Sequence, residues 1–192
     1  MGATGIHFER MNVPEHLESF CGPIVEGWRT DPDGKKMPCT VARFERGPSQ
    51  GSVTFATLGL NSYRLKSATS QKLIRHELVM LARKDAIPGN LPALLHQVSA
   101  EAVSRGRAYL RGEVIGPRNP LFTGTALTAL YVAIPVYFPD EFNSVDGVVF
   151  VWLIPITTRE AAFVSAEGWS RFEDILVREN ADLLDLNRPS VV

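Results

Sequence analysis

The most distinctive pattern of the chain lies in residues 126–160, where two long apolar runs flank a short acidic turn. The runs read ALTALYVAIPVYF and GVVFVWLIPIT. Alternate side chains of a strand point to opposite faces, and neither run has a polar face. We therefore predict two central strands of a sheet that is covered on both sides. Pro135 and Pro155 cannot donate to a strand ladder, so each predicts a bulge or a strand end.

Shorter apolar patterns predict further strands on both sides of a helix-like segment at residues 91–106. In residues 72–83 one face of the predicted strand is mostly apolar and the other mixes polar and apolar residues. This pattern predicts a strand with one buried face. Turn residues between these runs favour an antiparallel meander, followed later by one more strand. The meander strands are residues 24–29, 40–46, 52–58 and 72–83, and the later strand is residues 107–115.

Three segments carry helix signals. Asn12 and Glu15 form a capping-box pair before a short amphipathic stretch that stops at Gly22. Asn90 caps an apolar stripe in residues 91–106. A second capping-box pair, Thr157 and Glu160, opens helical residues up to 180, with a break near Gly168. The order of elements predicts an α+β fold, a twisted, mostly antiparallel (mixed) sheet covered by helices, in one domain over residues 1–192 with its core from about residue 12.

Composition narrows the class of protein. The 192 residues, 45% of them hydrophobic and 21% charged, suit one globular domain with a substantial core. A net charge of -1 gives no global basic field for nucleic acid. The first ten residues have no apolar leader, and the longest apolar run falls short of the roughly 20 residues that span a bilayer. We expect a cytoplasmic protein with no membrane contact.

The candidate chemistry of the chain is sparse. Cys21 and Cys39 are far apart and form no metal or redox motif, so we expect reduced thiols and predict no metal and no cofactor. His76 and Glu77 are adjacent, but strand neighbours point to opposite faces and cannot meet at one substrate atom. We interpret His76 as a hydrogen-bonded core histidine. The alternative is a small-molecule hydrolase that uses His76 with carboxylates brought together by the fold.

Acidic residues gather near the C-terminus. Residues 167–185 contain six acids and two arginines. The simpler interpretation is a solvated helix face. The more specific interpretation is a docking surface for a basic partner, with Trp169 or Phe172 as an aromatic anchor. Both aromatics, however, also lie on the stripe that we expect to face the core. The partner-binding residues predicted on this surface are Trp169, Glu173, Asp174, Asp182 and Asp185.

An ordered set of short motifs resembles the suppressor-of-fused-like domain family, over nearly the whole chain from about Asn12 onward. The motifs are ATLGLN (56–61), RHELVM (75–80), GEVIGP (112–117), PVYFP (135–139), VWLIPIT (151–157), EA (160–161), GW (168–169), FE (172–173) and the ending DLLDLNRPSV (182–191). The resemblance implies the fold of the family's N-terminal domain and a non-enzymatic role. It implies no catalytic set to carry over.

The resemblance also implies two kinds of partner. Animal members are two-part proteins that sequester a transcription factor by gripping an extended segment, and this chain resembles only the first part. Short stand-alone members resemble bacterial immunity proteins, which neutralise toxins of polymorphic or contact-dependent systems. We therefore expect a protein-binding domain, with a toxin as partner or, alternatively, a regulatory protein bound at a sheet edge near residues 40–46. The oligomeric state stays open.

Overall fold

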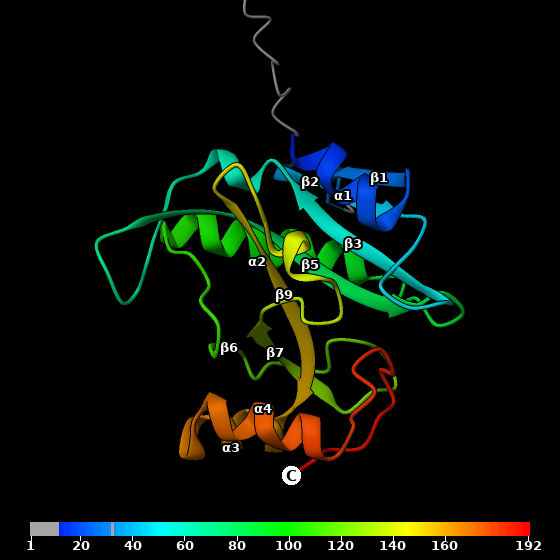
Figure 1. Cartoon of the computed structure of the whole chain (residues 1–192), viewed down its shortest axis with the longest axis vertical. Helices are drawn as coiled ribbons and strands as arrows, with labels where there is room; N and C mark the ends of the chain where they lie inside the picture. Colours follow the sequence, from blue (N-terminus) through cyan, green and yellow to red (C-terminus); the bar gives the residue numbers. More distant parts are fainter. Residues whose placement is uncertain (1–11, 32) are drawn as a thin grey trace, which may run out of the picture.

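The computed structural model describes residues 12–31 and 33–192 (Figure 1). The first ten residues, in which we predict no leader, lie outside this range. The helices are α1 (Val13–Cys21), α2 (Leu91–Arg105), α3 (Thr158–Glu167) and α4 (Trp169–Arg178), with 3-10 turns η1 (Leu60–Ser62) and η2 (Asp140–Asn143). The strands are β1 (Ile24–Thr30), β2 (Lys36–Phe44), β3 (Ser52–Leu58), β4 (Leu65–Lys66), β5 (Leu73–Arg83), β6 (Val114–Ile115), β7 (Leu127–Ala133), β8 (Ser144–Val145) and β9 (Val148–Thr157).

The strands form one mixed sheet in the order β1-β2-β3-β5-β9-β7-β6, while β4 pairs with β5 and β8 pairs with β9. The first four strands of this order make the predicted antiparallel meander. The pairing of β5 with β9 is parallel, and β9 pairs antiparallel with β7. The predicted α+β fold with a mostly antiparallel, mixed sheet is confirmed.

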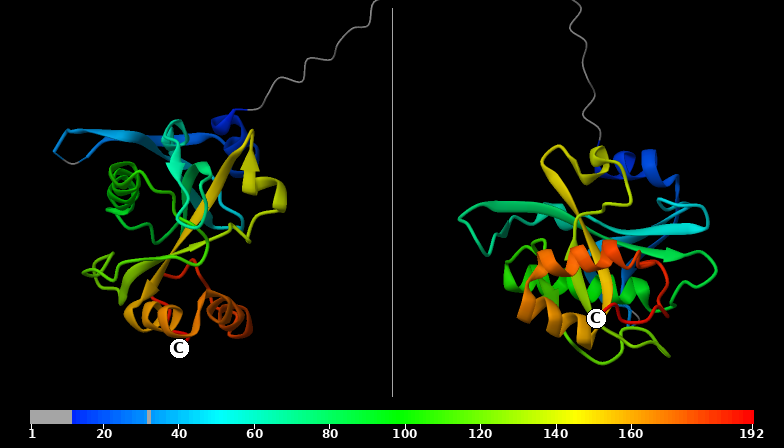
Figure 2. Two further views of the ribbon diagram at one scale, coloured as in Figure 1. Left: turned by 90° about the vertical axis from the view of Figure 1, so that its left-hand side faces the viewer. Right: turned by 60° about the horizontal axis from the view of Figure 1, so that its bottom comes forward.

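Helices cover both faces of the sheet, which separates two hydrophobic clusters. Leu78 and Leu153 point to the face packed against α2, with Leu95. Val79 and Trp152, one position along each strand, point to the face packed against α1, α3 and α4. Figure 1 shows α1 beside the first strands and the α3–α4 pair at the far end of β9. In the left view of Figure 2 the hairpin of β1 and β2 extends over α2.

Local sequence signals account for the helix boundaries. Asn12 and Thr157 each form a capping box, with Glu15 and Glu160 as predicted. The predicted break at Gly168 separates α3 from α4. Asn90 precedes α2, but its side chain makes no capping bond and donates instead to the Leu121 carbonyl, 2.8 Å away.

Several strand predictions are wrong in extent. The run after residue 126 forms a strand only to Ala133, because Pro135 interrupts the ladder and the chain turns, with Val136 N donating to Ile134 O at 2.7 Å. Val136 is therefore 67% exposed instead of covered. Of residues 107–115 only Val114–Ile115 is a strand.

Three further predictions need correction. Pro155, where we expected a bulge or a strand end, lies inside β9 and pairs with Leu130, and the register shift falls on β7 between Leu127 and Ala129, opposite Thr157 and Ile156. The predicted binding edge at residues 40–46 falls on β2, which lies between β1 and β3, so β1 forms the edge on this side of the sheet. Both faces of β5 are buried, because Glu77, Val79 and Leu81 are as inaccessible as the residues beside them.

Candidate functional site

A groove of about 430 Å³ lies between the sheet and helix α4, and we call it the α4 groove. Its floor is formed by buried residues of β7 and β9, namely Tyr131, Ala133, Trp152 and Ile154. One wall is the C-terminal part of α4 and the residues after it, namely Leu176, Val177, Asn180, Ala181 and Leu183. A second wall is the turn after β7, namely Ile134, Val136 and Tyr137, and the Tyr137 hydroxyl donates to the Ala181 carbonyl of the first wall at 3.4 Å. Arg111 and Glu173 supply its charged groups.

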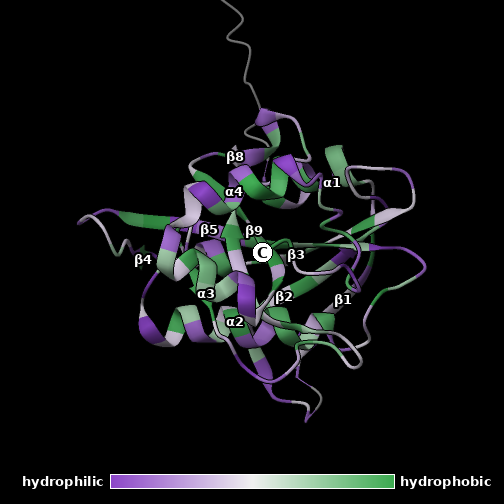
Figure 3. Cartoon of the chain, turned by 90° about the horizontal axis from the view of Figure 1, so that it is seen from below, coloured by the Kyte–Doolittle hydropathy of each residue, from purple (hydrophilic) through white to green (hydrophobic). Residues whose placement is uncertain are grey.

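The walls of the groove expose large apolar side chains to solvent. Val177 is 80% exposed, Val136 is 67% exposed, and Ile134 and Tyr137 are partly exposed. Val177 follows Leu176, which packs in the core, and therefore lies off the core-facing stripe of α4. In Figure 3 hydrophobic and hydrophilic residues alternate along α3 and α4. A group of exposed apolar residues around a concavity is typical of an interaction site.

A hydrogen-bonded group of three side chains holds the charged part of the groove. Glu173 Oε1 accepts from Arg111 Nε at 3.1 Å and from the Tyr131 hydroxyl at 2.7 Å, and Glu173 Oε2 accepts from Arg111 Nη2. Burial raises the pKa of the Tyr131 hydroxyl, and the hydrogen bond to Glu173 raises it further. The bond to Glu173 raises the pKa of Arg111, which stays cationic. Arg111 and Glu173 therefore neutralise each other at the groove.

Trp169 lies next to this group. The Arg111 guanidinium stands 4.7 Å from the centroid of the Trp169 ring, a cation–π arrangement. A Cβ placed on Gly112 would lie 2.5 Å from Trp169 Cγ, so the ring packs directly against the backbone there. Trp169 is 41% exposed, whereas Phe172 is fully buried. The prediction that both aromatics face the core is correct for Phe172 and wrong for Trp169.

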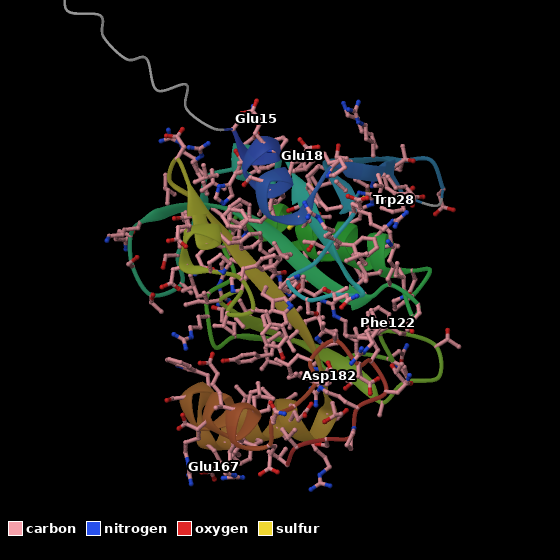
Figure 4. The ribbon with its side chains drawn as sticks, turned by 45° about the vertical axis from the view of Figure 1, so that its right-hand side comes forward. Glu15, Glu18, Trp28, Phe122, Glu167 and Asp182 are labelled. Carbon is pink, nitrogen blue, oxygen red and sulfur yellow. The ribbon has the colours of Figure 1, made fainter. Side chains whose placement is uncertain are left out.

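The structure disperses the predicted acidic residues. Glu173 lines the groove, and Asp174 follows it on the exposed side of α4. Asp182 forms an ion pair with Arg83 of β5, and Asp185 accepts from Asn187 N at 2.9 Å. Glu167 and Glu179 of the same stretch pair with Arg171 and Arg178. Figure 4 shows Glu167 at the outer helices and Asp182 nearer the sheet. Docking at these acids stays a prediction.

The groove also contains residues that pattern reasoning missed. Arg111 lies in a segment that we expected to be a strand, and Val136 and Tyr137 lie in a run that we expected to be buried. Pro135 was the available signal, because a strand that ends there leaves the following apolar residues without a neighbour. Val177 was detectable as the apolar residue off the core-facing stripe of α4.

His76 and Glu77 do not form a catalytic pair. His76 is fully buried against Tyr109, with ring centroids 6.4 Å apart, and among the described residues neither ring nitrogen has a hydrogen-bond partner. Burial lowers the pKa of His76 to about 4. The prediction of a core histidine is correct, but the predicted hydrogen bond is not found. Glu77 points to the opposite face, where Thr57 Oγ1, Gly59 N and Asn61 N donate to it at 2.6, 2.9 and 3.1 Å.

The cysteines are free and buried, and burial raises the pKa of Cys21 and of Cys39 to about 11 each. Over residues 12–31 and 33–192, no three His, Cys, Asp or Glu side chains gather in a way that could hold a metal ion. Within the same residues no helix has the length and apolar character needed to cross a membrane.

The fold has known relatives. The chain is similar to a putative suppressor of fused homologue from Neisseria gonorrhoeae, with a TM-score of 0.70, 19% identity, and coverage of 92% of this chain and 93% of that one. It is similar to a chain of the Sufu–Fu complex, with a TM-score of 0.67, 15% identity and coverage of 93% and 90%. The match to Drosophila Suppressor of Fused has a TM-score of 0.66 and 16% identity, and spans 93% of this chain and 50% of that one.

At these identities the solved structures establish the fold alone. A comparison with curated proteins finds no match. The sequence model of the suppressor of fused protein (SUFU) family matches residues 35–189, from just before β2 into the segment after α4. The chain therefore belongs to the suppressor of fused protein family.

Proposed function

We propose that the chain is a non-enzymatic domain that binds a protein partner through the α4 groove, and that it serves in the cytoplasm as an immunity protein that occludes a cognate bacterial toxin. The observation that carries the proposal is the pair of exposed valines, Val136 and Val177, on the two walls of an apolar groove. Exposed aliphatic side chains around a concave surface favour burial by a partner.

The use of polar groups elsewhere supports the same proposal. Glu77, Glu160 and Glu173, three acids with restricted access to solvent, are each held by several hydrogen bonds from the protein itself. His76 has no contact with solvent. The groove therefore offers shape and apolar surface, with one internally neutralised ion pair, rather than a poised acid or base.

The relatives add support at the level of the family. One of the structurally similar chains comes from the Sufu–Fu complex, which places that relative with a protein partner. The homologue from Neisseria gonorrhoeae is matched over 93% of its length, so it is of similar size to this chain. We extend protein binding to this chain on that basis.

The alternative role is sequestration of a regulatory protein by strand addition. The observation that favours it is the edge strand β1, on which Ile24 and Val25 are exposed. Register shifts between Ile24 and Glu26, and between Trp28 and Thr30, make this edge irregular. An irregular edge disfavours a long added strand, so we place the groove first.

Protection of cells tests the proposal. Candidate bacterial toxin domains are expressed with the wild-type chain, with the Val136→Asp/Val177→Asp variant, or with a Val25→Asp control on β1. The proposal expects the wild type and the control to restore growth and form a complex, and the double variant to fail. A chain that protects by consuming a small molecule, or that binds only a transcription regulator, would contradict the immunity role.

A further inference from the structure

The charge of the groove's surroundings specifies the chemistry of the occupant. This inference rests on the proposed function, because it concerns the partner of the same groove. The chain as a whole has a net charge of -1. Its acidic residues are not spread evenly, and the two segments that contain the walls of the groove carry more negative charge than the rest of the chain.

The wall formed by the turn after β7 belongs to a stretch without cations. Residues 119–158 contain no lysine or arginine, and their acids are Asp140, Glu141 and Asp146. Asp140 and Glu141 lie in η2, directly after the turn that supplies Val136 and Tyr137, and both are exposed. This wall is therefore apolar at the groove and acidic just beyond it.

The segment that contains the α4 wall also has more acidic than basic residues. Residues 167–185 contain six acids and two arginines, a surplus of four negative charges. Arg111 and Arg83 reach in from other elements to pair with Glu173 and Asp182, which reduces the surplus to two. The remaining surplus is at Asp174 and Asp185, since Glu167 and Glu179 pair within the stretch.

The two arginines at this border are held differently. Arg111 is bound to Glu173 through two hydrogen bonds and stays in place, whereas Arg83 and Asp182 are both exposed and their pair is screened by solvent. A cation from a partner can therefore approach Asp182 and the exposed acids without breaking a buried network. An anionic partner would instead meet the acids of both walls, which disfavours its approach.

We infer that the α4 groove binds a basic amphipathic segment of a protein partner, with apolar side chains between Val136 and Val177 and lysine or arginine side chains beside the acids of both walls. The volume of about 430 Å³ accommodates a few large side chains of such a segment. Apolar contacts supply most of the affinity, and the charges set the partner class and the association rate.

Three synthetic peptides of about 15 residues serve as probes. One alternates leucine and lysine at helical spacing, the second replaces each lysine by glutamate, and the third replaces each leucine by serine. Binding to the whole chain is measured by calorimetry or fluorescence anisotropy at several salt concentrations. The variants are Val177→Lys in the groove and Val25→Lys on β1 as a matched control, because both valines are exposed.

The inference expects the leucine–lysine peptide to bind best, with an affinity that decreases as salt increases. Val177→Lys should weaken it at least about tenfold, and Val25→Lys should leave it unchanged. Equal binding of the glutamate or the serine peptide, an equal effect of the two variants, or no binding of any peptide would each overturn it.

The same variants separate this inference from the proposed function. If the cognate toxin binds more weakly to the Val177→Lys variant but the leucine–lysine peptide binds no better than the other two peptides, the inference fails while the proposed function stands. If the leucine–lysine peptide binds as expected but no toxin or other protein does, the chemistry of the groove stands and the proposed function fails.

Discussion

Arg188 and Glu160 form a buried, two-pronged ion pair that ties the C-terminal segment to the start of α3. Arg188 Nη1 lies 2.5 Å from Glu160 Oε1, Nη2 lies 3.0 Å from Oε2, and the side chains are 5% and 0% exposed. Glu160 also accepts from the backbone N–H groups of Thr157 and Val191, and Arg188 donates to the Pro155 carbonyl. This pair fixes the segment that follows the α4 groove.

We expect Arg188→Ala to lower the free energy of unfolding by about 3–5 kcal/mol, because it leaves a buried carboxylate without its cation. Urea unfolding followed by circular dichroism measures the change. Arg171→Ala, which breaks the exposed pair with Glu167, is the control and should cost less than about 1 kcal/mol. The double variant Glu160→Gln/Arg188→Ala should recover part of the loss, and a loss equal to the sum of the single changes would contradict the coupling.

His76 should make stability depend on pH. Burial holds its pKa at about 4 in the folded chain, below the ordinary value of 6.5, so the unfolded chain binds one more proton between these values. The His76 contribution is therefore complete above about pH 6.5 and is lost as the pH falls toward about 4, for a total of about 3 kcal/mol. The free energy of unfolding of the wild type and of His76→Phe is measured across this pH range. The difference between the two proteins isolates the His76 contribution, because the other groups titrate alike in both. Parallel curves for the two proteins would contradict the buried, unpartnered state of His76.

Glu77 holds the turn η1 to the sheet. Its carboxylate accepts from three consecutive backbone N–H groups, those of Gly59, Leu60 and Asn61, and from the Thr57 hydroxyl. We expect Glu77→Ala to cost about 3 kcal/mol, since several donors in this part-buried region lose their partner. Glu26→Ala, at an exposed pair with Arg43, should change the free energy of unfolding by less than about 1 kcal/mol. Hydrogen exchange localises the effect, and unchanged protection of residues 59–61 would be inconsistent with this role.

Gly112 positions Trp169 and, through it, Arg111. Its φ is +90°, and an added Cβ would lie 2.5 Å from Trp169 Cγ. We expect Gly112→Ala to destabilise the chain by about 2–4 kcal/mol, from backbone strain and displacement of the ring. Gly124→Ala is the matched control, because Gly124 has a φ of +79° and the added Cβ has no atom within 4 Å. Its loss of stability therefore measures the backbone strain without a steric contact. Equal losses for the two variants would show that Trp169 does not pack against Gly112.

Much of this fold follows from the sequence because strong local signals agree with the packing. The two capping boxes, the break at Gly168 and the meander of the first strands are local features, and all are found in the structure. The parallel pairing of β5 with β9 depends on a long connection that local patterns do not encode. Residues 107–113 read as a strand in the sequence, yet the segment joins the sheet at its two ends, through the bridge between Arg107 and Lys66 and through the backbone bonds of Gly112 and Glu113 with Val132, at 2.8 and 2.9 Å.

The candidate site was less predictable for a related reason. Charge and aromatic character identify Glu173 and Trp169 in the sequence. Their spatial neighbour Arg111 lies 58 positions before Trp169 and 62 before Glu173, so no local pattern connects them. Val136 and Val177 have the same hydrophobic character as core residues, and only the end of β7 and the orientation of α4 place them at the surface. Hydrophobic character by itself predicts that a side chain is buried. The exposed apolar residues of a binding surface are therefore recognised only when the fold is known.

The most direct test of the account is hydrogen–deuterium exchange of the whole chain, alone and in complex with its cognate toxin domain. The account predicts new protection at the two walls of the α4 groove, residues 131–137 and 173–183, and none at β1. Protection confined to β1, or an unchanged pattern together with catalytic turnover by the purified chain, would contradict it.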